Sequence, residues 1–448
     1  MNLIFTKGAG SDPRQLMLSH ARADYVYMYP PRQAYRPVDV NHLGRAVETS
    51  LLMKGQVNLY FHFPLCSQVC SFCNLFTMVD DGTAIDKYVD ILLAELRHYA
   101  PLISGRRVDT LYLGGGTPSL LPAKTFARVF QEIETLGLAV VSQIPEVAIE
   151  SAPDTISQEK FEAYRDIGIN RVNIGVQSVA DAELALIRRK HGAGVVLTAL
   201  ETLLRIGFQN LCVDLIYGLE GQTDELWAKS VETICDYRPN TICAYPLTLR
   251  PRTGFAARGY TSLDGDMLYR RYDVANTILQ SRGYRQETHV RWIRDQSGGY
   301  RQKKNHWAGD DILGIGAGAR GYLHFADYRN GYSIRNRRKA LDAYIQRVRA
   351  VGHGRSEGIF LDEEERRRRS AILGLGSLDR VAFREKHGIP VEHCFGEHLA
   401  AFMEVGALAE SPSHYSWTEL GQKFRDVLVQ ELFSQPVREL VVNYDYNE

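Results

Sequence analysis

The sequence predicts an α/β fold built around a parallel sheet. From residue 56 onward, short β-rich runs alternate with amphipathic stretches of helical length, an order typical of parallel strands joined by right-handed crossovers. About six such units fit here, which is too few for a closed eight-fold barrel. The expected strands cover residues 57–63, 110–113, 146–150, 171–175, 210–215 and 241–247. The expected helices cover residues 84–99, 123–136, 158–166, 195–206 and 225–236.

An N-terminal extension, residues 1–54, precedes this region. Residues 24–37 contain four tyrosines, three prolines and two arginines, and the prolines disfavour a regular helix. Two interpretations stay open. In one, the segment is an extended arm packed on the body of the protein, and in the other its aromatic and arginine side chains line or cover a substrate site. The two interpretations are compatible.

The main domain is expected to span residues 55–345, and a small helical C-terminal domain is expected over residues 346–448. Residues 362–369 place four acids before four arginines, because the run reads Asp-Glu-Glu-Glu-Arg-Arg-Arg-Arg. That order suits the helix dipole and i,i+4 pairing. We therefore interpret the run as a solvent-facing helix rather than as a nucleic-acid patch. A further amphipathic helix is expected after residues 415–421.

Composition sets outer bounds on function. Of the 448 residues, 45% are hydrophobic and 24% are charged, as in an ordinary globular protein. The formal net charge is zero, which argues against a general nucleic-acid binder. No apolar run of about 18 residues predicts a membrane span, and residues 1–7 lack the apolar stretch of a signal peptide. We expect a cytoplasmic protein with neither a nucleic-acid nor a membrane partner.

Three cysteines, Cys66, Cys70 and Cys73, follow the first expected strand with the spacing C-x3-C-x2-C. Three thiolates on one short loop can hold three irons of a cubic [4Fe-4S] cluster and leave the fourth iron open. Zinc is an alternative, with His62 as a possible fourth ligand, and inert thiols are another. Disulfides are not expected, because seven cysteines without a secretory signal fit a reducing compartment. The scattered cysteines are interpreted as small core side chains: Cys212, Cys235, Cys243 and Cys394.

The cysteine run is the first of a series of motifs. It follows Tyr60-x-His62-x-Pro64, and the later blocks are Gly114-Gly115-Gly116-Thr117-Pro118, Ile149-Glu150, Gly175-Val176-Gln177-Ser178, Asp214-Leu215-Ile216-Tyr217-Gly218 and Gly314-Ile315-Gly316-Ala317-Gly318-Ala319. In order and spacing these blocks resemble the radical S-adenosylmethionine (SAM) superfamily, in the branch typified by oxygen-independent coproporphyrinogen oxidase, the HemN-like branch. The resemblance covers about residues 55–325. It implies an open partial (β/α)6 TIM-like barrel with sites at the C-terminal ends of strands, and a winged-helix-like C-terminal domain.

The resemblance also implies cofactors. The three clustered cysteines would hold a [4Fe-4S] cluster, SAM would bind its open iron, and one electron would split SAM into methionine and a 5′-deoxyadenosyl radical. Members of this branch bind two SAM molecules. The positions that match the family's cofactor-binding residues are Phe72, Gly115, Gly116, Thr117, Glu150, Gln177, Arg189, Asp214, Pro246 and Ala319. Arg188 is an alternative to Arg189, because the match can slip by one residue there.

Within the branch, three features resemble the class C radical SAM methyltransferases: the Cys-Asn-Leu-Phe-Thr run at residues 73–77, the Arg-Pro-Arg-Thr-Gly run at residues 250–254, and the tyrosine-rich arm. This resemblance favours C-methylation of an sp2 carbon in an aromatic or heteroaromatic substrate of a natural-product or cofactor pathway. The substrate would be a small molecule or peptide-borne, and flavodoxin or ferredoxin would be the reducing partner.

The candidate catalytic residues are Tyr60, which matches a family tyrosine near the cluster, and the possible general bases Glu287, His289 and Tyr322, with His306 beside them. Two alternative functions stay open. One is an anaerobic tetrapyrrole enzyme that decarboxylates propionates or opens haem, and the other is a non-catalytic haem-trafficking protein.

Overall fold

The computed structural model describes residues 12–20, 25–37, 40–79, 85–261, 264–295, 299–333 and 335–444. Residues 1–7, from which the lack of a signal peptide is read, lie outside these ranges. The centre is a twelve-stranded mixed sheet in the order β14-β13-β12-β11-β1-β4-β5-β6-β7-β8-β10-β9. The run from β11 to β8 is parallel throughout. The α/β prediction is therefore confirmed.

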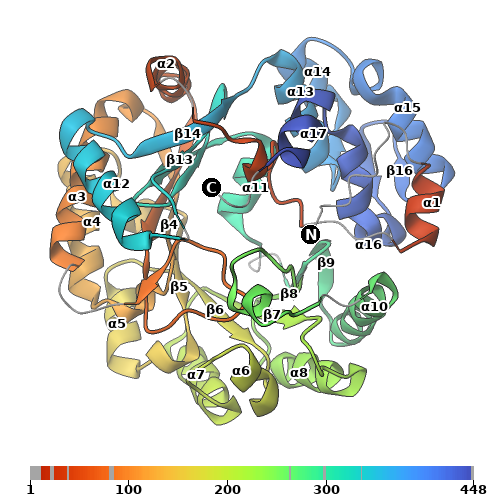
Figure 1. Cartoon of the computed structure of the whole chain (residues 1–448), viewed down its shortest axis with the longest axis horizontal. Helices are drawn as coiled ribbons and strands as arrows, with labels where there is room; N and C mark the ends of the chain where they lie inside the picture. Colours follow the sequence, from red (N-terminus) through yellow and green to blue (C-terminus); the bar gives the residue numbers. More distant parts are fainter. Residues whose placement is uncertain are drawn as a thin grey trace.

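The expected strand and helix alternation is present with bounds close to those predicted. The strands are β1 (Gln56–Phe63), β4 (Arg107–Gly115), β5 (Glu146–Ser151), β6 (Arg171–Gln177), β7 (Asn210–Tyr217) and β8 (Thr241–Pro246). The helices between them are α3 (Ile85–Tyr99), α4 (Ala123–Thr135), α5 (Gln158–Asp166), α7 (Ala193–Ile206) and α8 (Asp224–Asp236), with the short α6 (Asp181–Leu186) before α7. Figure 1 shows these helices along the outer side of the curved sheet.

Local sequence explains where these helices begin, end and pack. Thr223 caps α8 by accepting a hydrogen bond from the amide of Leu226 at 3.2 Å, and two acids follow in the first turn. Gly207 ends α7 with φ 77°, a conformation that glycine adopts without strain. On α4, one apolar stripe faces the sheet, and it consists of Phe126, Val129, Phe130 and Ile133.

The sheet has a seventh parallel strand where six were predicted. β11 (Asp311–Ile315) pairs with the free edge of β1 after the short helix α11 (Arg301–Ala308). Antiparallel strands extend both ends: β10 (Arg291–Ile293) and β9 (Arg285–Thr288) beyond β8, and β12 (Arg320–Tyr322), β13 (Ala326–Asn330) and β14 (Arg355–Phe360) beyond β11. Segments this short show little periodicity, so the sequence did not predict them. Among the described residues the two end strands do not pair, and the sheet is open.

A second hydrophobic cluster lies in the C-terminal region, beside the sheet (Figure 1). Its elements are α13 (Glu363–Gly374), β15 (Leu378–Asp379), α14 (Arg380–His387), α15 (Val391–Glu404), β16 (Leu408–Glu410), β17 (His414–Trp417), α16 (Glu419–Leu428) and α17 (Gln435–Val442). The charged run forms α13, capped by Asp362. Its solvent-facing interpretation needs one correction: Arg369 is buried and pairs with Asp327 at 2.6 Å.

The N-terminal arm, residues 25–37, is extended apart from a short 3-10 turn at Arg32–Ala34, and it joins the two parts of the molecule. Val26, Tyr29 and Ala34 are buried in the C-terminal cluster. The arm continues into α2 (Val40–Leu51), which packs on β13 and β14 and adds to the main core. The other helices are α1 (Pro13–Leu18), α9 (Gly254–Ala257), α10 (Gly265–Ser281) and α12 (Arg337–Val351). Within the described residues, no helix combines the length and apolar character needed to cross a bilayer.

Candidate functional site

The three clustered cysteines lie on one loop at the C-terminal end of β1. Cys66 ends the short strand β2 (Leu65–Cys66), which pairs with β3 (Met78–Val79) and closes the loop. Between these strands the amide of Cys73 donates to the carbonyl of Cys70 at 3.1 Å. All three thiols are free and line a common cavity, which we call the thiol cavity.

The glycine run after β4 packs tightly against this loop. The amide of Gly116 donates to the carbonyl of Phe63 at 2.8 Å, and the amide of Thr117 donates to the carbonyl of Leu65 at 2.7 Å. A Cβ atom at residue 116 would overlap that Leu65 carbonyl, so only glycine fits. The Thr117 hydroxyl lies 3.6 Å from the sulfur of Cys66. The glycine run therefore holds the backbone close to the thiols.

The thiols fit a cluster better than a single zinc ion. Two sulfurs bound to one zinc lie within about 4.6 Å of each other, but these three Sγ atoms do not all lie within 4.8 Å of one another. The proposed fourth zinc ligand is also engaged elsewhere. His62 Nδ1 lies 3.0 Å from the Tyr60 hydroxyl, and Nε2 lies 2.9 Å from the carbonyl of Phe76. A multi-iron cluster, whose thiolates bind different irons, does not need its three sulfurs within reach of one metal ion.

The thiol cavity has a volume of about 210 Å³. Its walls come from the C-terminal ends of successive parallel strands, where the sequence placed the site. The predicted residues that line it are Cys66, Phe72, Cys70, Cys73, Gly115, Gly116, Thr117, Glu150, Gln177, Arg189 and Asp214. Asn173 also lines it and was not predicted, although it lies two residues before the Gly-Val-Gln-Ser block on β6.

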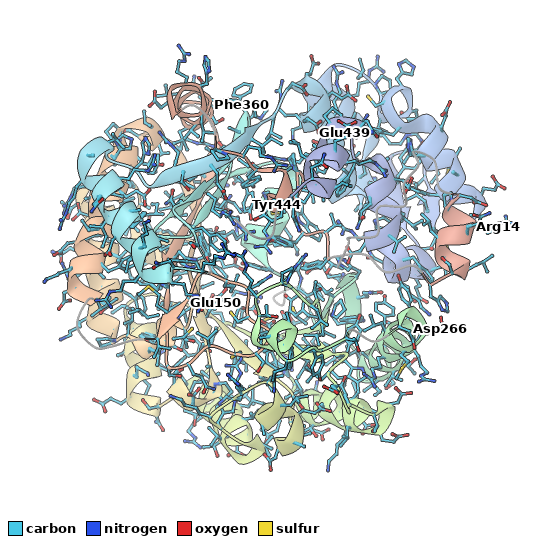
Figure 2. All side chains as sticks on the ribbon, in the orientation of Figure 1. Arg14, Glu150, Asp266, Phe360, Glu439 and Tyr444 are labelled. Carbon is cyan, nitrogen blue, oxygen red and sulfur yellow. The ribbon has the colours of Figure 1, made fainter. Side chains whose placement is uncertain are left out.

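Two carboxylates face this cavity from β5 and β7. Glu150 lies in the interior of the molecule (Figure 2), where it accepts hydrogen bonds from the amide of Gly115 and the hydroxyl of Tyr112, both at 2.9 Å. Burial raises the pKa of Glu150 to about 7 and that of Asp214 to about 6. Both groups can accept hydrogen bonds from a ligand when ionised, and both titrate near neutral pH.

The structure separates the two arginines that the sequence left open. Arg189 lines the thiol cavity and donates to the carbonyl of Gly175 at 3.0 Å, whereas Arg188 is exposed. Nearby, Gln177 ends β6 with φ 72°, an uncommon conformation for a residue other than glycine. Such strained positions occur at functional sites.

A larger cavity of about 560 Å³, the central cavity, adjoins the thiol cavity. Six residues line both: Phe72, Cys73, Leu75, Glu150, Gln177 and Asp214. Four further predicted residues line the central cavity alone, namely Tyr60, Pro246, His306 and Tyr322. A ligand in the central cavity would therefore lie beside whatever the thiols hold.

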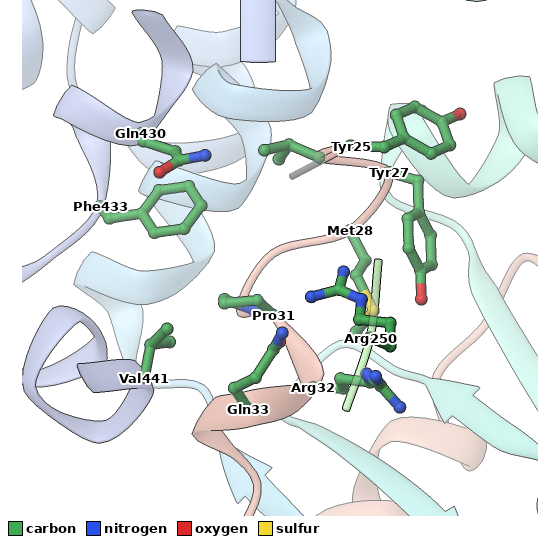
Figure 3. A pocket seen from close by; sticks show the side chains of 11 residues that line it. Tyr25, Tyr27, Met28, Pro31, Arg32, Gln33, Arg250, Gln430, Phe433 and Val441 are labelled. Atoms are coloured by element: carbon green, nitrogen blue, oxygen red, sulfur yellow. The ribbon is translucent and has the colours of Figure 1, made fainter. Parts of the chain in front are cut away.

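The arm forms part of the central cavity, as one of its two interpretations expects. Tyr25, Tyr27 and Arg32 line it, and Arg32 also lines a small pocket that faces the C-terminal helices (Figure 3). Four cations from other elements line the central cavity and were not among the predicted site residues: Arg250, Arg291 on β10, Lys303 on α11 and Arg320 on β12. The one sequence feature that pointed to Arg320 is its position directly after the last glycine-rich block, residues 314–319.

Three predicted residues do not line either cavity. Glu287 binds Arg291 and lies 2.9 Å from Lys304. Burial would raise the pKa of Glu287, but the two cations outweigh it and the pKa is lowered. His289 lies 3.1 Å from Asp426 of α16. Burial lowers the pKa of His289, so its contact with Asp426 does not require a charged ring. Both candidate bases thus lie outside the linings of the two cavities and contact a charged side chain, and spacing along the chain cannot reveal such partners.

Ala319 is the third of these residues. It is fully buried, and Gly318 lines the central cavity instead. His306, by contrast, does line the cavity. It is buried, its ring centroid lies 4.7 Å from that of Tyr322, and its Nε2 has no hydrogen-bond partner among the described residues.

The four scattered cysteines lie away from both cavities. Cys212 and Cys243 are buried on neighbouring strands with their sulfurs 3.7 Å apart, and the Cys212 sulfur lies 3.8 Å from a carboxylate oxygen of Asp214. Cys235 is buried in the core, and Cys394 is partly buried. None of the four lines the thiol cavity or the central cavity.

Comparison with known proteins agrees with this geometry. Residues 60–234 match the family model of the radical SAM superfamily. Heme chaperone HemW of Escherichia coli is 31% identical over 277 residues, which cover 61% of this chain and 72% of the relative. Heme chaperone HemW of Lactococcus lactis is 29% identical and covers 81% of this chain and 93% of the relative.

A solved structure resembles nearly the whole fold. It is coproporphyrinogen III oxidase (HemN) from Escherichia coli, with a TM-score of 0.77 and 22% identity over 91% of this chain and 96% of that chain. The known structure thus shares the arrangement of the sheet and the C-terminal region seen here. At 22% identity this match shows a similarity of fold alone.

Proposed function

Because this chain belongs to the radical SAM superfamily, in its HemN-like branch, we propose that it binds SAM on a [4Fe-4S] cluster in the thiol cavity and a tetrapyrrole in the central cavity. The observation that carries the proposal is the adjoining pair of cavities, which share six lining residues. The names of the HemW relatives support a haem-type ligand, since haem is a tetrapyrrole.

The chain's own residues divide the work between the two cavities. Cys66, Cys70 and Cys73 would hold the cluster, which when bound supplies the electron that splits SAM. Gly115 and Gly116 allow the backbone to approach SAM closely, and the ionised Glu150 accepts hydrogen bonds from its hydroxyl groups. All of the residues given these roles line the thiol cavity.

The central cavity suits a flat aromatic ligand. Tyrosine side chains from six separate segments line it: Tyr25 and Tyr27, Tyr60, Tyr245, Tyr300, Tyr322, and Tyr332. Aromatic rings bind the face of a macrocycle by offset stacking and edge contacts. Phe72 lines both cavities and would lie between the cluster and this ligand.

Methyl transfer is a second candidate function. It is favoured by the two carboxylates, Glu150 and Asp214, which face both cavities and could each accept hydrogen bonds from a separate SAM molecule. The HemW names do not support it, and they favour a tetrapyrrole function over the C-methylation suggested by the sequence motifs.

Product analysis of the anaerobically reconstituted and reduced protein tests both functions. We expect SAM to yield 5′-deoxyadenosine and methionine, and we expect haem or a porphyrin to bind with a defined stoichiometry. Carbon dioxide released from a porphyrinogen would identify a decarboxylase. S-adenosylhomocysteine formed together with 5′-deoxyadenosine would identify a methyltransferase. Failure to bind any tetrapyrrole would refute the main proposal.

A further inference from the structure

We propose that Lys303, Arg320 and Arg32 form a carboxylate-binding subsite in the wall of the central cavity, and that the ligand there is an aromatic molecule with at least two carboxylate groups. The inference rests on the proposed function and deepens it, because it specifies how the ligand is recognised. The three cations come from α11, β12 and the N-terminal arm, and all three line the cavity.

The first argument is the absence of counter-ions. Among the described residues, no carboxylate lies within 4.0 Å of these three side chains. Lys303 donates to the carbonyl of Tyr27 at 3.0 Å, and Arg320 donates to the hydroxyl of Tyr27 at 2.5 Å. Arg32 has a long contact of 3.5 Å with the hydroxyl of Tyr332. We infer that the remaining N–H donors of these three side chains bind an acceptor on the ligand.

Most other buried arginines among the described residues have carboxylate partners, and Arg355, which donates to the hydroxyl of Tyr99 at 3.1 Å, is an exception. Arg106 pairs with Asp311 at 2.8 Å, and Arg369 pairs with Asp327 at 2.6 Å. Burying a positive charge without a partner costs several kcal/mol in general, which explains this pattern. The three cavity cations depart from this pattern together, next to a cavity large enough for a ligand.

The shifted pKa of Lys303 supports the same conclusion. Burial, together with the positive charges of Arg291 and Arg425, holds the pKa of Lys303 well below its usual range. A ligand carboxylate placed beside Lys303 would reverse this shift and keep the ammonium charged. Binding would therefore relieve an electrostatic cost that the ligand-free protein carries.

The arrangement also orients the ligand. Tyr27 lies between two of the cations, because the Lys303 ammonium lies over its ring, 4.8 Å from the centroid. The cavity's own carboxylates, Glu150 and Asp214, lie where it adjoins the thiol cavity. Like charges repel, so the anionic edge of a ligand would face Lys303 and Arg320 and its uncharged part would face the cluster.

A pair of probes tests this subsite. Mesoporphyrin, a dicarboxylate, and its uncharged dimethyl ester are titrated into the full-length, cluster-loaded protein, and binding is followed by fluorescence quenching. We expect the diacid to bind at least about 30-fold more tightly than the ester, as for charge-assisted hydrogen bonds lost at two groups. Lys303→Met and Arg320→Met should each weaken diacid binding by about 10-fold and leave ester binding unchanged.

Lys304→Met is the matched control. Lys304 is the next residue on α11, but it pairs with Glu287 and does not line the cavity, so diacid binding should not change. Circular dichroism and SAM binding show that each variant is folded. Equal binding of diacid and ester, or variants that lose both probes alike, would overturn the subsite and leave the proposed function standing. Binding of neither probe to the SAM-competent wild type would overturn both.

Discussion

At the scale of single residues, Glu150 connects electrostatics to cofactor binding. Its carboxylate faces both cavities, and burial raises its pKa to about 7. A carboxyl group whose pKa is raised in the folded state adds stability at low pH, and this contribution is lost as the pH rises through that pKa. Ligand donors need the ionised form, which the folded protein gains only above about pH 7.

SAM binding should therefore strengthen as the pH rises from about 6 to about 8, because the ionised fraction of Glu150 increases over that range. Glu150→Gln cannot ionise, so its SAM affinity should be lower by about 10-fold at the higher pH and nearly flat across the range. Isothermal titration calorimetry at matched ionic strength measures this. An unchanged pH profile in the variant would show that another group controls SAM binding.

Residue types and spacing predicted the part of the site that depends on contiguous motifs. Cys66, Gly115 and Asp214 lie in the motifs that carry the resemblance to the radical SAM superfamily, and all three line the thiol cavity. Lys303 and Arg320 escaped prediction because their significance lies in missing partners. Only the three-dimensional structure shows which cations have a carboxylate nearby.

At the scale of elements, the buried Glu95 of α3 holds one edge of the sheet together. It accepts hydrogen bonds from the amides of Gly316 at 2.8 Å and Gly354 at 2.7 Å, from Tyr344 at 2.8 Å and from Asn330 at 3.0 Å. These donors belong to the segment after β11, the residue just before β14, α12 and β13. One side chain thus fixes four elements around the last glycine-rich block.

Glu95→Ala should lower the free energy of unfolding by about 3 kcal/mol or more, because it leaves several buried donors without an acceptor. Urea unfolding followed by circular dichroism measures the change. The control is Asp90→Ala on the same helix, whose exposed ion pair with Arg128 should contribute at most about 1 kcal/mol. Equal losses in the two variants would contradict a special role for Glu95.

Prediction of the elements succeeded where they are long and failed where they are short. The helix α3 buries one apolar face over 15 residues, and the strand β7 is a run of eight mostly buried residues. β10 and β12 have three residues each, which is less than the periodicity needs, and their pairing depends on contacts distant in sequence. The seventh parallel strand, β11, is also short, with five residues. The sequence therefore indicated this segment only through its glycine-rich motif.

At the scale of the whole molecule, the N-terminal arm couples the C-terminal cluster to the central cavity. The ring of Tyr29 is fully buried in that cluster, and its hydroxyl donates to Glu365 at 2.5 Å and accepts from the amide of Ser434 at 3.1 Å. Two residues earlier, Tyr27 contacts Lys303 and Arg320 in the cavity wall. The sequence left the role of this arm open, and its burial decides that it packs on the body and lines the cavity.

Tyr29→Phe should loosen the arm, because it removes the hydroxyl that joins Glu365 and Ser434. We expect a loss of about 1–2 kcal/mol in the free energy of unfolding and weaker binding of the central-cavity ligand. SAM affinity should stay the same, since the arm does not line the thiol cavity. Parallel titrations with SAM and mesoporphyrin measure the two effects, and an equal loss for both ligands would argue against this coupling.

The most direct test of the whole account is electron paramagnetic resonance of the reduced, iron- and sulfide-loaded protein with and without isotopically labelled SAM. The account predicts a four-iron cluster whose spectrum shifts on addition of SAM, with hyperfine coupling from the labelled amino and carboxylate groups. Zinc in place of iron, or a cluster spectrum that SAM leaves unchanged, would contradict it.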